Sequence, residues 1–179
     1  MSRFRFLVVV LGLFAAGCGS DNDVAPSAVA PNRLVFGAQL SALNEVPALV
    51  AGNAELGARG NVTLTMNLTR NASGAITANT VDVVATLTGF PNGSSLSASH
   101  IHIGGPTVAG AVVIPLNPSA GEVTMPNGSG SYVRSFQVVD SAQIDATNQV
   151  IANPAGFYFN VHTATNPGGA ARGQLALVP

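Results

Sequence analysis

The sequence predicts an all-β fold, a Greek-key β-sandwich or barrel with about eight strands. Apolar residues alternate with Thr, Asn and Ser along several segments, which is the period of a strand with one buried face. Clusters of turn-forming residues separate these segments, such as 91–93 (PNG) and 166–169 (NPGG). The segments are also rich in valine and threonine, which favour strands over helices.

The first 33 residues are expected to precede the folded domain. Two arginines come before an apolar run at 6–16, and the only cysteine, Cys18, follows it. The run is too short for a membrane-spanning helix, which needs about 20 apolar residues. Segment 1–17 resembles a bacterial lipoprotein signal with Cys18 as the lipidated residue, and the alternative is an ordinary secretory signal. Residues 18–33 are small and polar, so they are expected to form a flexible tether.

The protein is therefore expected in the bacterial cell envelope, facing the periplasm or the cell surface, with its N-terminal lipid in the membrane. Loss of Arg3 and Arg5 with the signal would leave five arginines against eight acidic residues, a net charge of −3. Such weak charge argues against nucleic acid as a partner. With Cys18 lipidated, no cysteine is left for a disulfide, so residues 34–179 must fold as one domain by packing alone.

The alternation locates the strands within this domain. Segment 61–69 (NVTLTMNLT) is the clearest, because every second residue is apolar and the others are Asn or Thr. The expected strands are 34–40, 61–69, 80–88, 97–103, 111–116, 131–139, 156–163 and 172–178. Segment 141–152 lacks the alternation and is expected to be a short helix or a long loop.

All three histidines lie on two of the expected strands. In 99–105 (SHIHIGG), alternation places His100 and His102 on one face and the isoleucines on the other. In 157–163 (FYFNVHT), it places His162 opposite the two phenylalanines. All three imidazoles are therefore expected on the side of their strands that does not face the core.

If the two strands are neighbours, the three rings could hold a metal ion. Side chains two residues apart on a strand start about 7 Å apart, a gap that two imidazoles can close on one ion. Three neutral imidazoles suit copper or zinc, and copper binds such a set more tightly. Asn160 or a backbone carbonyl would then orient the rings. The alternatives are a hydrogen-bonded polar cluster and three surface side chains.

Several short motifs, taken in order, resemble the CHRD domain family, which is named after chordin. The matching segments are 40–47 (LSALNEVP), 99–105, 110–113 (GAVV), 157–163 and 172–175 (RGQL). The resemblance covers essentially all of 34–179. It implies an extracellular domain that binds a partner, without naming the ligand.

A second resemblance concerns the copper site of Cu,Zn superoxide dismutase. It implies that His100, His102 and His162 are copper ligands and that Arg172 attracts an anionic substrate. The zinc ligands, the bridging histidine and the disulfide have no counterpart here, which leaves a copper-only or a non-catalytic site. Another interpretation of Arg172 is a structural pair with a carboxylate such as Glu45. The expected fold is therefore immunoglobulin-like or superoxide-dismutase-like.

These observations leave three functions open. The first, which the family resemblance favours, is a non-enzymatic binding module that needs no cofactor and takes a protein or surface ligand. The second is a protein that holds one copper ion through the three histidines, for copper capture or, as an enzyme, for copper-only dismutase-like chemistry. The third is a structural or adhesive surface domain.

Other enzyme chemistry is not indicated by the sequence. Glu45, Glu55 and Glu122 lie near Pro or Gly, where solvated turns are expected. No Gly-x-Ser-x-Gly motif occurs, and the many Ser and Thr residues follow the outward positions of strands.

Overall fold

The computed structural model describes residues 30–179. Over this range it confirms the all-β prediction, with a single α-helix beside the strands. The predicted signal at 1–17, the lipidated Cys18 and nearly all of the tether at 18–33 lie outside the described residues, so they stay predictions. Within the described part, no helix is both long enough and apolar enough to cross a membrane.

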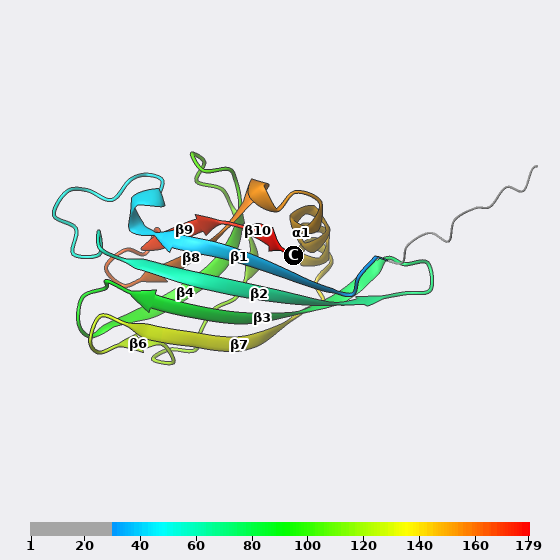
Figure 1. Cartoon of the computed structure of the whole chain (residues 1–179), viewed down its shortest axis with the longest axis horizontal. Helices are drawn as coiled ribbons and strands as arrows, with labels where there is room; N and C mark the ends of the chain where they lie inside the picture. The colour runs from blue at the N-terminus through cyan, green and yellow to red at the C-terminus, as the bar shows by residue number, and fades with distance from the viewer. Residues whose placement is uncertain (1–29) are drawn as a thin grey trace, which may run out of the picture. The chain divides into compact units, whose positions relative to one another are not determined.

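The described residues form ten strands, one α-helix and two short 3-10 helices (Figure 1). The strands are β1 (Arg33–Ser41), β2 (Arg59–Arg70), β3 (Ile76–Thr88), β4 (Ser94–Ile103), β5 (Val112–Pro115), β6 (Thr124–Met125), β7 (Gly130–Val138), β8 (Phe157–Thr163), β9 (Ala171–Gln174) and β10 (Ala176–Val178). The helices are η1 (Ala42–Asn44), α1 (Ser141–Ala152) and η2 (Pro154–Gly156).

The strands pair antiparallel in a sheet that curls into a nearly closed barrel. The main path runs β5-β4-β8-β9-β1-β2-β3-β7, and the short strands β10 and β6 pair with β1 and β4. The two ends of the path lie close together. The Tyr132 hydroxyl of β7, at one end, donates to the Leu116 carbonyl just after β5, at the other end, at 2.5 Å. The connection from β3 to β4 crosses the barrel, and β7 returns to pair with β3. This is a Greek-key arrangement.

The predicted strands lie within a few residues of their expected bounds, with one correction. The expected strand 172–178 is two strands, β9 and β10, which pair with different neighbours. The chain changes partner at Leu175, whose backbone N–H donates to the Phe157 carbonyl and whose side chain is buried. The two-residue strand β6 is additional, and it is too short to show an alternation.

Segment 141–152 is helix α1, which decides between the helix and the loop that the sequence left open. The Asp140 carboxylate accepts hydrogen bonds from two backbone N–H groups of the first turn, as an N-cap residue does. Ile144 and Val150 from this helix join the hydrophobic core.

The core lies inside the barrel, where the inward side chains of the strands form one hydrophobic cluster. Strand β8 is buried on both of its faces along its whole length. Phe159 and Val161 belong to the core cluster, whereas Asn160 and His162 on the alternate face contact loops. The histidine face is therefore distinct from the core face, as predicted, but it is covered.

Candidate metal centre

Strands β4 and β8 are neighbours, and their pairing brings the histidines together. His102 stands opposite Tyr158, His100 opposite Asn160, and His162 opposite Ala98. Facing residues of an antiparallel pair point to the same side of the sheet. The register therefore places all three imidazoles on one side.

The three imidazoles converge. The ring centroid of His100 lies 4.8 Å from that of His162 and 5.4 Å from that of His102. The centroids of His102 and His162 are 5.8 Å apart. One ring nitrogen of each residue lies within 4.8 Å of the other two. The sequence identifies these residues without deciding whether they meet, and the structure shows that they do.

Backbone carbonyls determine which ring nitrogens are free. Nδ1 of His102 lies 3.0 Å from the Gly110 carbonyl oxygen, and Nδ1 of His162 lies 3.1 Å from that of Pro167. A carbonyl oxygen only accepts, so each Nδ1 carries the proton and each Nε2 keeps a lone pair. Nε2 of His162 lies 3.1 Å from Nδ1 of His100, from which it accepts.

His102 is left with a buried lone pair that has no partner. Its Nε2 makes no hydrogen bond with any of the described residues, and the side chain is buried. Buried polar atoms are rarely left unpaired in folded proteins, so this atom needs an explanation. The carbonyls of Gly110 and Pro167 orient the rings, whereas Asn160, the other predicted orienting group, donates to Glu45 at 3.5 Å.

Burial favours the neutral form of all three rings. Burial lowers the pKa of His100 from 6.5 to about 4, and the neighbouring His162 and His102 lower it further. Burial also lowers the pKa of His102 and of His162, against the opposing effect of their carbonyl hydrogen bonds. Neutral imidazole is the form that binds metals, so the lone pairs are available without the loss of a proton.

Lowering the pH from 6.5 to 4 is expected to destabilise the metal-free protein. The unfolded chain takes up protons on its histidines near pH 6.5, but the folded chain resists protonation of His100 down to about pH 4. The contribution of His100 to the free energy of unfolding is therefore fully present above pH 6.5. It is lost as the pH falls from 6.5 to about 4. Thermal unfolding in EDTA measures the effect. If the stability of the variant His100→Ala/His102→Ala/His162→Ala depends on pH in the same way, the prediction is contradicted.

A stack of three side chains supports His102. The Tyr158 ring lies parallel to the imidazole, with centroids 4.9 Å apart and planes 6° apart. The Arg172 guanidinium carbon lies 4.2 Å from the centroid of the same Tyr158 ring. The Tyr158 hydroxyl also accepts a hydrogen bond from the Gly110 N–H, at 3.1 Å. Tyr158 thus holds both the ring of His102 and the loop residue that bonds this ring.

The Arg172 side chain is buried in the described fold and binds backbone carbonyls. Its guanidinium donates to the backbone carbonyls of Asn44, Pro106 and Val108 at 2.6 to 2.9 Å. With the side chain only 1% exposed, an anion from solvent has no access to it. The predicted pair with Glu45 is not formed as a salt bridge, because the described residues contain only the bridge between Arg134 and Glu122.

Asn44 takes the place predicted for Glu45 in holding the first and last segments together. Its amide donates to the Arg172 carbonyl, and its own carbonyl accepts from the Arg172 side chain. The prediction that Glu45 and Glu55 lie in solvated turns is wrong, since they are 5% and 0% exposed. Glu122, in contrast, does lie at the surface, where it pairs with Arg134.

Replacing Gly110 with alanine is expected to weaken copper binding by about 10–100-fold, the usual cost of losing a partner that orients a metal-binding histidine. A Cβ atom at this position would overlap the carbonyl oxygen of Ile103, so the loop must shift away from His102. Isothermal titration with copper(II) measures the change. Gly105→Ala is the matched control, because a Cβ atom at Gly105 meets nothing within 4 Å. Equal affinities of the two variants would contradict the prediction.

The sequence analysis does not identify the residues that orient the rings. Gly110 and Pro167 act through their backbone carbonyls, which no side-chain pattern reports. The signal that could have found them is their position, in the glycine-rich and proline-rich loops that directly follow the histidine-bearing strands.

The comparisons with known proteins identify one family. A family model described as CHRD domain matches residues 36–175, which include the three histidines and Arg172. No curated protein matches the chain.

Proposed function

The chain belongs to the CHRD domain family, and on this premise we propose that it is an extracytoplasmic binding protein whose ligand is a single copper ion. At the level of the family, the match supports a binding-type module outside the cytoplasm. Copper, and the residues that would hold it, are our proposal.

The observation that supports the proposal is the unpartnered Nε2 of His102 beside the nitrogens of His100 and His162. A polar cluster without a metal would leave this buried lone pair unsatisfied, at a cost of about 1–3 kcal/mol. A metal ion bound by His102 Nε2, His162 Nε2 and His100 Nδ1 would use the unpartnered nitrogen of His102 and the two nitrogens through which His100 and His162 face each other. His100 is the least buried of the three and can move its proton to Nε2.

The donor set favours copper over other metals. The described residues contain no acidic or cysteine side chain in this cluster, so the hard cations magnesium and calcium lack the oxygen ligands that they require. Imidazole suits zinc and copper, and copper binds a given nitrogen site more tightly. When bound, copper supplies one-electron redox chemistry. Because Arg172 is buried, it is not available to attract superoxide from solvent, and we favour copper capture over catalysis.

We also propose that Cys18 is lipidated and attaches the domain to a membrane of the bacterial cell envelope through the tether at 18–33. The arrangement of basic, apolar and small residues before this single cysteine supports the proposal. We expect Cys18→Ser to move the exported protein from the membrane fraction to the soluble fraction. Unchanged recovery with the membranes would contradict lipidation.

Copper(II) titration followed by EPR tests the proposed function. We expect the purified Cys18→Ser chain to bind one equivalent of copper with hyperfine coupling to nitrogen ligands, and the variant that also lacks all three histidines to lose it. Absence of stoichiometric binding to the folded chain would contradict the proposal. A binding module for another ligand or an adhesive domain would then be the better account.

A further inference from the structure

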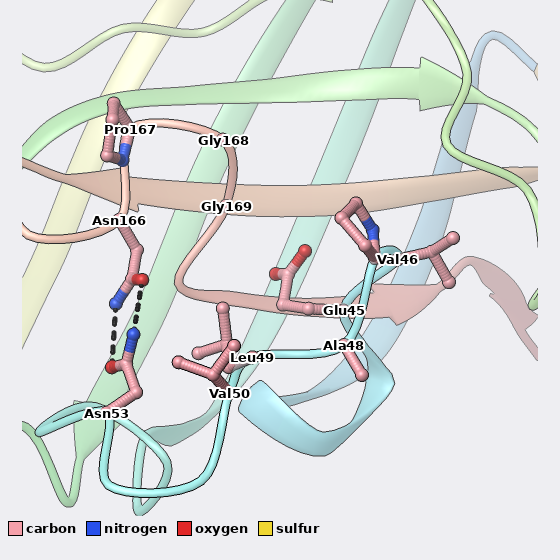
Figure 2. A pocket seen from close by; sticks show the side chains of 11 residues that line it. Glu45, Val46, Ala48, Leu49, Val50, Asn53, Asn166, Pro167, Gly168 and Gly169 are labelled. Atoms are coloured by element: carbon pink, nitrogen blue, oxygen red, sulfur yellow. Dashed lines mark hydrogen bonds between the residues drawn. The ribbon is translucent and has the colours of Figure 1, made fainter.

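A pocket is lined in part by the turn whose Pro167 carbonyl bonds His162. It has a volume of about 250 Å³ and is lined by the segment that follows η1 and by the turn after β8. The lining residues are Glu45, Val46, Pro47, Ala48, Leu49, Val50, Asn53, Asn166, Pro167, Gly168 and Gly169. The two walls are joined by paired amides, since Asn53 and Asn166 donate to each other at 2.7 and 3.1 Å (Figure 2).

Glu45 is the only charged residue among those that line this pocket, and one of its oxygens has no partner. Figure 2 shows its carboxylate in the middle of the lining residues, between Val46 and the turn at Gly169. The side chain is 5% exposed. Oε2 accepts a long hydrogen bond from the Asn160 amide, at 3.5 Å, whereas Oε1 accepts none from the described residues. A buried acceptor without a donor needs an explanation, and a donor group bound in the pocket would supply one.

The backbone fits closely around this carboxylate. Gly169 has φ 144°, in the region that favours glycine, and a Cβ atom there would overlap Oε2 of Glu45. Arg172 is the charged group whose field acts on Glu45, but it bonds backbone carbonyls and forms no salt bridge with the carboxylate. The charge of Glu45 is therefore not neutralised by direct contact. Burial raises its pKa to about 7, against the opposing effects of Arg172 and Asn160.

We propose that this pocket binds a small primary ammonium ion, which donates to Oε1 of Glu45 and places its aliphatic part against Pro47 and Leu49. A guanidinium group is less suitable, because it binds both oxygens of a carboxylate and Oε2 already accepts from Asn160. A divalent metal ion needs several oxygen ligands, and the pocket offers one free carboxylate oxygen. An ammonium group requires one strong acceptor and leaves its other N–H groups to water. The site is separate from the copper ligands and does not depend on them.

An NMR titration of the purified chain with n-butylammonium chloride tests the proposal. We expect saturable shifts of the amides of Val46, Gly168 and Gly169, and affinity at least about tenfold weaker for n-butanol, which has the same chain but no charge. Affinity for n-butylammonium should fall as the pH is lowered from 8 to 5, because protonation removes the negative charge of Glu45. Equal affinity for the two probes would overturn the proposal, and this comparison needs no variant.

A variant locates the binding to Glu45. Glu45→Gln keeps the size of the side chain and should weaken n-butylammonium binding at least about tenfold while removing its pH dependence. Glu122→Gln, which removes a surface carboxylate, is the matched control and should bind like the parent chain. Copper binding should be unchanged in Glu45→Gln, which separates this test from that of the metal centre. Full n-butylammonium affinity in folded Glu45→Gln would overturn the proposal.

Discussion

Replacement of His102 by alanine is expected to lower the affinity for copper(II) at least about 100-fold. Loss of a group that only orients a ligand costs about 10–100-fold, and His102 is itself a proposed ligand. His102 offers the one ring nitrogen of the three that is buried and without a partner. The Gly110 carbonyl and the Tyr158 ring hold this imidazole in place before any metal arrives. The variant removes the proposed ligand that is already oriented, so little of the lost affinity can be recovered by another side chain.

Competition titration against a copper chelator measures this change. Asn148→Ala is a suitable control, because it removes a nitrogen-bearing side chain from the exposed face of α1, away from the cluster. Thermal unfolding in EDTA shows whether His102→Ala is folded. A folded His102→Ala variant with copper affinity within about threefold of the parent chain would mean that the three rings are a polar cluster and not a ligand set.

Replacement of Arg172 by methionine is expected to destabilise the fold by at least about 4.5 kcal/mol, because hydrogen bonds to a charged group contribute about 1.5–3 kcal/mol each and three are lost. The change leaves the carbonyls of Asn44, Pro106 and Val108 without their donor in a site where the parent side chain is 1% exposed. Those carbonyls belong to the segment after β1 and to the loop that contains Gly110. Urea unfolding in EDTA measures the loss of stability.

Arg134→Met is the matched control for this prediction. Arg134 pairs with Glu122 at 2.6 Å, but its side chain is 37% exposed, and surface pairs contribute only about 0–1 kcal/mol. We therefore expect a much smaller effect than for Arg172→Met. If the two variants are equally stable, Arg172 does not hold the loops together, and its proximity to Tyr158 needs another explanation.

The strands could be predicted because each has one polar and one apolar face. In β2, the alternation of Val62, Leu64 and Met66 with Thr and Asn is complete, and these three side chains are buried. The alternation fails where burial is two-sided or where strands are short. β8 is buried throughout, so its polar face could not be recognised as covered, and β6 has only two residues.

The three histidines could be identified as candidate ligands from the sequence, but their convergence and the groups that support them could not. Alternation places His100 and His102 on one face from local geometry alone. His162 joins them only because β8 pairs with β4, and 62 residues separate it from His100. Glu45 and Glu55 are likewise buried by contacts between segments that are far apart in the sequence. The turn after β8 closes over the segment after η1, a long-range contact that short turn motifs do not report.

The most direct test of the copper proposal is anomalous X-ray diffraction at the copper edge from crystals of the chain grown with copper. We predict a single strong peak within bonding distance of His100 Nδ1, His102 Nε2 and His162 Nε2. A peak at any other position, or a structure in which the three rings keep their hydrogen bonds and no copper lies between them, would contradict it.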